Sequence, residues 1–195
     1  MRGVSSSFAE NLTPQSMDGK ILANLLVAAN GATTQGGRSA PLSPPDDRRR
    51  FHAIRSQAKA IVIGGNTFRH EPYSRTPIPL YVATSHPPLD PPLDPPLDPP
   101  LEESGSTALR CFLNKAPTEV VERALAEQGA PILVEGGVGF LTPLIEKKVI
   151  DTFYLTRVPK RGDGNFFDDS LLNERYSLAH SEVENDTIFE VWKPR

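Results

Sequence analysis

Cysteine is scarce in this sequence, and long apolar runs are missing from it. Cys111 is the single cysteine among 195 residues, so no internal disulfide can form, and such a chain fits a reducing compartment best. No run of about 18 apolar residues is present, so no transmembrane helix is expected. Residues 1–20 are polar and include Glu10 and Asp18, which a signal peptide would not favour. We therefore expect a cytoplasmic protein without membrane contact, and we interpret residues 1–20 as a flexible or surface-packed arm.

The sequence also lacks an excess of positive charge. Its formal net charge is −3, whereas nucleic-acid-binding domains usually carry a basic face. The one basic cluster, residues 48–50, follows two aspartates and is interpreted as the solvated start of a helix. No nucleic-acid partner is expected.

Several catalytic motifs are absent. No C-x-x-C pair is present, which excludes the zinc deaminase signature. The histidines at positions 52, 70, 86 and 180 show no metal-ligand spacing. Neither a Walker A motif nor G-x-S-x-G occurs. We expect no metal site, and no phosphoryl-transfer or serine-hydrolase chemistry of these kinds.

Proline is abundant in one segment, residues 87–101, where Pro-Pro-Leu-Asp repeats. Proline lacks a backbone donor and fixes φ, so this segment is predicted to be neither helix nor central strand. An extended, polyproline-like surface loop is expected. It could serve as a ligand for a proline-recognising module or be an expanded repeat in a tolerant loop, and we favour the second interpretation.

The remainder of the chain alternates short buried strands with helices. Strands are predicted at 21–29, 60–63, 78–83, 107–113, 131–134 and 151–158. Helices are predicted at 44–57, at 66–69, at 117–128 and over Leu141 to Lys148, and segment 31–39 is predicted as a glycine-rich loop. Two antiparallel strands, 176–183 and 187–192, end the chain. The prediction is one domain over 1–195, a three-layer α/β fold with a mostly parallel central sheet and antiparallel C-terminal edge strands.

The first helix carries an apparent start signal. Ser43-Pro44-Pro45-Asp46 has the form of a capping box with proline at the first helical position. We expect the helix to begin there.

Polar and glycine residues follow several of the predicted strands, at the edge where such sheets bind ligands. They are Asn30-Gly31, Gly64-Gly65, Thr84-Ser85 and Glu135-Gly136-Gly137. Gly136 to Gly139 could cradle a dinucleotide phosphate at a helix N-terminus, or could be a tight turn without a ligand. The spacing is not that of the G-x-G-x-x-G fingerprint.

Charged side chains near this edge allow two interpretations each. Glu135 could accept hydrogen bonds from a heterocycle, or could be a turn or capping residue. Arg55 could clamp a phosphate, or could be a surface arginine. Arg38, Ser39 and Arg75 lie in loops with the same ambiguity.

Three stretches together resemble a known family. LVAANGATTQGGRSAPLS (26–43), RRRFHAIRSQAKAIVIGGNTFRHEPY (48–73) and ILVEGGVGFLTPLIEKKVIDTFYLT (132–156) are similar to the pyrimidine reductases of riboflavin biosynthesis. These occur as the C-terminal half of a bifunctional deaminase–reductase and as single-domain actinobacterial reductases, which the final stretch LAHSEVENDTIFEVW also resembles. The resemblance covers about residues 21 to 193, apart from the proline repeat.

The resemblance implies a dihydrofolate-reductase-like fold, a homodimer and NADPH as the cofactor. It implies a reductase that converts a phosphoribosylamino-pyrimidine, in its deaminated or undeaminated form, to the ribitylamino-pyrimidine phosphate. The residues it marks are Asn30 and Glu135 as catalytic; Thr67, Glu71, Ser85, Gly136, Gly137, Val138 and Gly139 for the cofactor; and Ser39, Arg55, Arg75 and Glu135 for the substrate.

The sequence departs from the family in two segments. The family commonly has Ser-Leu-Asp-Gly where this chain has Ala28-Ala29-Asn30-Gly31, and an amide neither carries charge nor donates a carboxyl proton. Pro41 replaces a tryptophan of some relatives. Two alternatives therefore stay open: a dihydrofolate-reductase-like enzyme on another pteridine-like substrate, and a diverged NADPH-binding protein without turnover.

Overall fold

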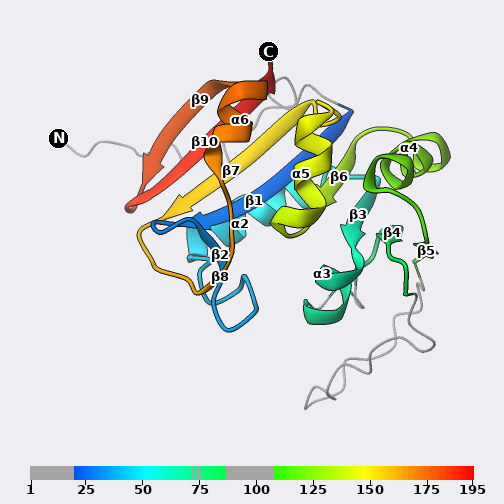
Figure 1. Cartoon of the computed structure of the whole chain (residues 1–195), viewed down its shortest axis with the longest axis horizontal. Coiled ribbons are helices and arrows are strands. Elements are labelled where there is room, and N and C mark those ends of the chain that lie inside the picture. Colours follow the sequence, from blue (N-terminus) through cyan, green and yellow to red (C-terminus); the bar gives the residue numbers. More distant parts are fainter. Residues whose placement is uncertain (1–19, 72, 74–75, 87–107) are drawn as a thin grey trace.

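A computed structural model describes residues 20–71, 73, 76–86 and 108–195 (Figure 1). The predicted arm at 1–20, except Lys20, and the predicted repeat loop at 87–101 lie outside these residues, as does Arg75. No helix among the described residues is long and apolar enough to cross a membrane.

One sheet of eight strands forms the centre of the molecule, in the order β5-β4-β3-β6-β1-β7-β10-β9. Its parallel strands are β1 (Ile21–Ala28), β3 (Ala60–Gly64), β4 (Leu80–Ala83), β5 (Arg110–Leu113), β6 (Ile132–Glu135) and β7 (Thr152–Val158). Strands β10 (Thr187–Pro194) and β9 (Tyr176–Glu184) join β7 in antiparallel fashion. The predicted sheet, mostly parallel with an antiparallel C-terminal edge, is confirmed.

Helices cover both faces of this sheet, which gives the predicted three layers. Alternate residues of β1, from Ile21 to Val27, pack in one cluster with α4 (Pro117–Gln128) and α5 (Val138–Glu146). Leu22, which points to the opposite face, packs with Ile54 of α2 (Pro45–Arg55), and α3 (Gly65–His70) adds Phe68 to a third cluster with β3 and β4. Burial of the central strands on both faces explains why β3 and β6 are continuous apolar runs, and why β1 is apolar apart from Asn24.

Three short elements differ from the prediction. Residues 31–39 were predicted as a loop, but they contain β2 (Ala32–Thr34), which pairs with β8 (Gly164–Phe166) as a small separate antiparallel sheet. A seven-residue helix, α6 (Asp169–Arg175), precedes β9. A three-residue strand shows too little alternation to predict from sequence, and its partner lies about 130 residues away along the chain.

The start of α2 also differs from the prediction. Pro44 occupies the N-cap position and makes no side-chain hydrogen bond, so the expected capping box does not form. The Ser43 hydroxyl instead donates to Asp47 Oδ2 at 2.5 Å. The helix begins one residue later than a Ser43 cap requires, because both prolines fit the positions around its first turn.

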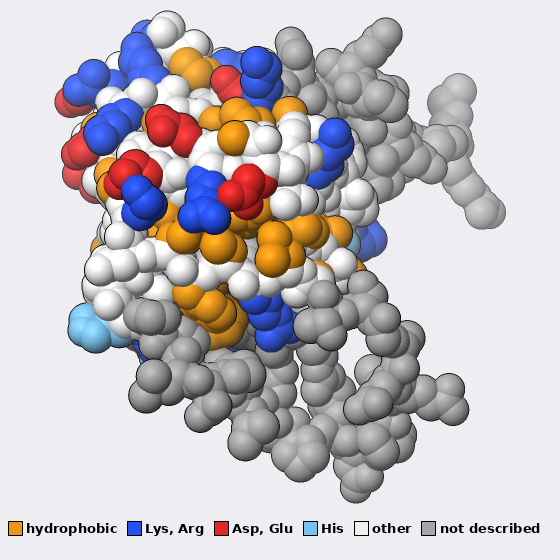
Figure 2. All heavy atoms as spheres, turned by 90° about the vertical axis from the view of Figure 1, so that its right-hand side faces the viewer, with side chains coloured by type: hydrophobic (Ala, Val, Ile, Leu, Met, Phe, Trp, Pro, Cys, Tyr) orange, Lys and Arg blue, Asp and Glu red, His pale blue; other side chains and the backbone are white. Residues whose placement is uncertain are grey.

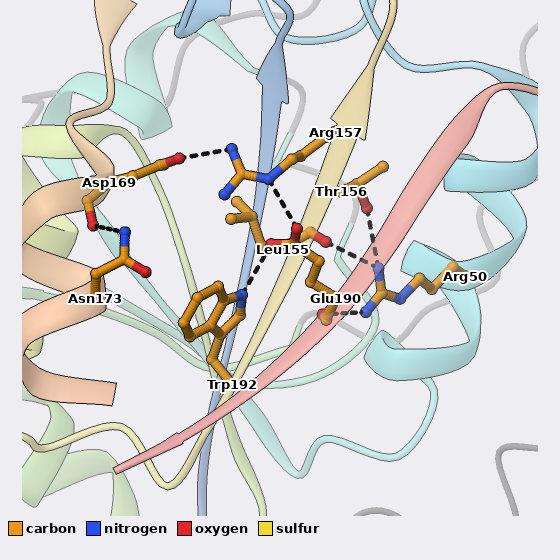
Figure 3. A network of polar contacts seen from close by, with 8 residues as sticks. All are labelled: Arg50, Leu155, Thr156, Arg157, Asp169, Asn173, Glu190 and Trp192. Carbon is orange, nitrogen blue, oxygen red and sulfur yellow. Dashed lines mark hydrogen bonds and ion pairs between the residues drawn. The ribbon is translucent and has the colours of Figure 1, made fainter. Parts of the chain in front are cut away.

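The basic cluster at 48–50 is only partly solvated. Arg48 and Arg49 are exposed, but Arg50 is 2% exposed. Figure 3 shows its guanidinium at β7 and β10, where it donates to the carbonyls of Leu155 and Glu190 and to the Thr156 hydroxyl. The prediction was wrong for Arg50, because this residue lies on the side of α2 that packs against the sheet.

The β5 edge of the sheet faces the viewer in Figure 2, where apolar side chains form a band beside charged ones. All four residues of β5 are half-buried. Exposed ion pairs lie on α4 (Arg123–Glu127) and at its start, where Lys115 precedes the helix and pairs with Glu119. The cleft lies at the central strands β1 and β6 and is lined in part by α2 and α3.

Candidate active site

A cleft of about 290 Å³ lies where the ends of β6 and α3 approach α2. Its wall includes residues from β1, β2 and the loop after β2, and residues from α2 and α3. Among the predicted site residues, those that line it are Ser39, Arg55, Thr67, Glu71, Glu135, Gly136 and Gly137. The fold thus brings together residues that are spread over about a hundred positions of sequence.

Glu135 is the last residue of β6 and is 2% exposed. Its carboxylate accepts from Arg55 Nε at 3.2 Å and Nη2 at 2.6 Å, and from the Tyr73 hydroxyl at 2.5 Å. A buried carboxylate is tolerated when it is paired and hydrogen-bonded. Arg55 and Tyr73 therefore fix the Glu135 carboxylate in the cleft wall, and the positive charge of Arg55 compensates its negative charge.

The pKa values of both partners of Glu135 are raised, in part by this contact. Burial alone would lower the pKa of Arg55, but the hydrogen bond and charge of Glu135 outweigh it and raise that pKa above its ordinary value. Burial, followed by the negative charge of Glu135, raises the pKa of Tyr73 well above 10. Arg55 stays charged and Tyr73 keeps its proton, so both remain donors to Glu135.

The predicted glycine turn after β6 is present. A Cβ on Gly136 would lie 3.1 Å from the Phe140 ring, and one on Gly64 would lie 3.2 Å from the same ring, so both turns pack closely on Phe140. A Cβ on Gly137, by contrast, would have no atom within 4 Å. Gly137 is the N-cap of α5, which has no side-chain cap. The start of α5 thus faces open space.

Glu71 and Ser39 form a second contact at the cleft. The Ser39 amide and hydroxyl donate to Glu71 Oε1 at 2.8 Å and 2.9 Å. This ties the loop after β2 to the end of α3, beside Thr67. The two residues close one side of the cleft together.

Four further predicted site residues that the structure describes do not line the cleft. Asn30 donates through Nδ2 to the Gly162 carbonyl at 2.9 Å and accepts from the Gly162 amide at 3.1 Å. Ser85 is exposed after β4, with its hydroxyl 2.8 Å from His86 Nδ1. Val138 and Gly139 lie in the first turn of α5, behind Gly137. The structure therefore does not place these four residues in the cleft wall with Glu135.

Several residues of the cleft wall were not predicted from the sequence. Asp47, Phe51 and Arg55 recur every four residues, so they share one face of α2, and all three line the cleft. This helical spacing could have identified Asp47. Tyr73 and Asn24 gave no such signal, because Tyr73 follows α3 in irregular structure and Asn24 interrupts an apolar strand.

Comparison with protein families assigns the chain to one family. The model of the RibD C-terminal domain family matches residues 16–187. The chain belongs to this family. No curated protein matches it.

Solved structures share the fold at low identity. A pyrimidine reductase-like protein of Corynebacterium diphtheriae has a TM-score of 0.66 and 19% identity, over 95% of this chain and 96% of that one. The Thermotoga maritima diaminohydroxyphosphoribosylaminopyrimidine deaminase/phosphoribosylaminouracil reductase has 0.64 and 11%, over 90% of this chain and 56% of that one, so this chain spans about half of that protein. Enterococcus faecalis dihydrofolate reductase, solved with NADP(H), has a TM-score of 0.60 and 17% identity, over 90% of this chain and 96% of that one. The predicted dihydrofolate-reductase-like fold is confirmed.

Proposed function

We propose that this RibD-family protein is an NADPH-dependent reductase of riboflavin biosynthesis that acts on a phosphoribosylamino-pyrimidine. One observation carries the proposal: Glu135 and Gly136, at the end of β6, share a cleft with Thr67 and Arg55. The resemblance marks these residues for substrate and cofactor, and the family match supports an oxidoreductase.

The start of α5 suits a dinucleotide phosphate. Open space at Gly137 admits a ligand where a larger side chain would intrude, and the uncapped amides and dipole of a helix start favour an anion. We propose that the turn from Gly136 to Gly139, together with Thr67 and Glu71, holds NADPH, and that Ser85 contacts it farther out. When bound, NADPH would supply a hydride.

The opposite part of the cleft would hold the pyrimidine sugar phosphate. Opening of the ribosylamine ring gives an imine at C1′, and reduction adds a hydride to C1′ and a proton to the nitrogen. Ser39, Arg55, Arg75 and Glu135 are proposed to position the substrate for this step. Arg55 would do so while paired with Glu135: its side chain is 24% exposed and remains part of the wall.

Asn30 is proposed to act through the segment that it fixes. Its amide binds both backbone groups of Gly162, and Asn165, three residues further on, lines the cleft. In this proposal Asn30 replaces the family aspartate as a positioning residue. We also infer a homodimer that works in the cytoplasm, as the resemblance implies.

The test is consumption of NADPH with three substrates: the undeaminated pyrimidine, the deaminated pyrimidine and dihydrofolate. We expect oxidation with a ribosylamino-pyrimidine and none with dihydrofolate. Turnover of dihydrofolate alone would favour the pteridine reductase alternative. NADPH binding without turnover of any substrate would favour a diverged protein.

A further inference from the structure

Asp47 is a buried carboxylate in the cleft wall that the proposed reaction does not use. It lies in the first turn of α2 and is 5% exposed. Ser43 donates to its Oδ2, while Oδ1 is fully buried and has no hydrogen-bond partner among the described residues. A buried acceptor without a donor costs free energy, so its presence at a ligand cleft needs a reason.

Asn24 is a second such group. It lies on β1 opposite Glu135 of β6, and it lines the same cleft. Its Oδ1 is also buried without a partner in the described part of the chain. Every carboxylate oxygen of Glu135, by contrast, has a donor. Two side chains that line the cleft therefore each hold a buried acceptor oxygen without a donor among the described residues, whereas the third, Glu135, is already bonded.

Arg50 lies near Asp47 and is itself bonded to the sheet. Arg50, one turn further along α2, lies close enough for the Asp47 charge to favour its protonated form. The Arg50 guanidinium is fixed to β7 and β10 by three acceptors. Arg50 thus fastens the first turn of α2 to the sheet without bonding to Asp47 Oδ1.

We propose that Asp47, with Asn24, recognises N–H donors of the substrate heterocycle, and so selects the undeaminated pyrimidine. This inference rests on the proposed function. A 2-amino-pyrimidinone presents an amino group beside a ring N–H, two donors that match acceptor oxygens. The deaminated ring has a carbonyl oxygen in place of that amino group. This oxygen is an acceptor, so the Asp47 carboxylate would repel it. A site built for a donor discriminates strongly against a ligand that lacks it.

The test is calorimetric binding of the two ribosylamino-pyrimidine phosphates in the presence of NADP⁺, which cannot reduce them. We expect the wild type to prefer the undeaminated form by about tenfold or more. Asp47→Asn keeps the shape but offers an amide that can both donate and accept, so the preference should vanish or invert. Asp46→Asn is the matched control: this neighbouring carboxylate pairs with Arg49 and Asn185 and does not line the cleft, so the preference should stay.

Each outcome decides a separate point. Equal binding of both pyrimidines to the wild type, or an unchanged preference in Asp47→Asn, overturns the inference about Asp47 but not the proposed reductase activity. A preference that Asp47→Asn abolishes, without NADPH oxidation, keeps the inference and overturns the reductase. Binding of neither pyrimidine overturns both. If Asp47→Asn does not fold, Asn24→Ala takes its place and should weaken the same preference.

Discussion

Two arginines on the same helix lie in opposite environments. Arg50 faces the sheet, where its neighbours are carbonyls, a hydroxyl and the rings of Tyr154 and Phe189. Arg55 faces the cleft, where it meets the carboxylate of Glu135 and stacks over Phe51 and Tyr73.

Their pKa values move in opposite directions for this reason. Burial lowers the pKa of Arg50 to about 10, because the charges near it compensate only in part. Glu135 raises the pKa of Arg55 despite burial. A buried cation among neutral acceptors fastens elements together, whereas one that is paired with a carboxylate builds a polar site.

The largest expected effect is on the sheet side. Arg50→Met should lower the free energy of unfolding by about 3 kcal/mol, since it leaves three acceptors without their donor and Asp47 without a nearby positive charge. Chemical denaturation measures this. Arg49→Met is the control, and it should change stability by less than about 0.5 kcal/mol because the Arg49 side chain is exposed. Equal losses in both variants would contradict the structural role of Arg50.

On the cleft side the expected loss is in function. Glu135→Gln removes the charge that faces Arg55, so kcat/KM should fall about 100-fold, or roughly 2.7 kcal/mol. Steady-state NADPH oxidation measures the change. Glu127→Gln, on the exposed face of α4, should leave kcat/KM as it is. Wild-type kinetics in Glu135→Gln would show that the charge of Glu135 is not needed for substrate binding or reduction.

Alkaline pH should lower the free energy of unfolding, because it ionises buried tyrosines on both faces of the sheet. Burial raises the pKa of Tyr154 and of Tyr176 to about 12. Since both ionise near 10 when unfolded, their contribution to stability is complete below pH 10 and is lost as pH rises toward 12, up to about 2 kcal/mol each. Arg50 opposes this loss, because its pKa is lowered in the fold. Ultraviolet titration should show that these tyrosines ionise only above pH 11 or on unfolding, and normal titration near 10 would contradict their burial.

The smallest expected effect is at Gly137. The Cβ that Gly137→Val adds would have no described atom within 4 Å, so the fold should keep its stability within about 1 kcal/mol. The side chain would fill the space at the start of α5 and raise the Kd of NADPH about tenfold, roughly 1.4 kcal/mol. Fluorescence titration with NADPH measures this. An unchanged Kd would mean that the cofactor does not approach Gly137.

The contrast between the two arginines also shows which parts of the fold and of the candidate site could be predicted from the sequence. Apolar runs specified β1, β3 and β6, and a strand followed by Glu135-Gly136-Gly137 marked one end of the cleft. The burial of Arg50 depends on β7 and β10, which lie over a hundred residues away, and the Arg55–Glu135 pair joins residues 80 positions apart. Periodicity carries no information on such contacts. Asp47 is the exception, since its helical spacing from Arg55 was readable.

Transfer of the hydride itself tests the central claim most directly. The enzyme would be supplied with NADPH deuterated at the transferable position and with the ribosylamino-pyrimidine phosphate, and the product would be analysed by mass spectrometry. We predict a ribitylamino-pyrimidine phosphate that carries one deuterium at C1′, formed by the wild type and at a much lower rate by Glu135→Gln. A product without deuterium, or no reduced pyrimidine at all, would contradict it.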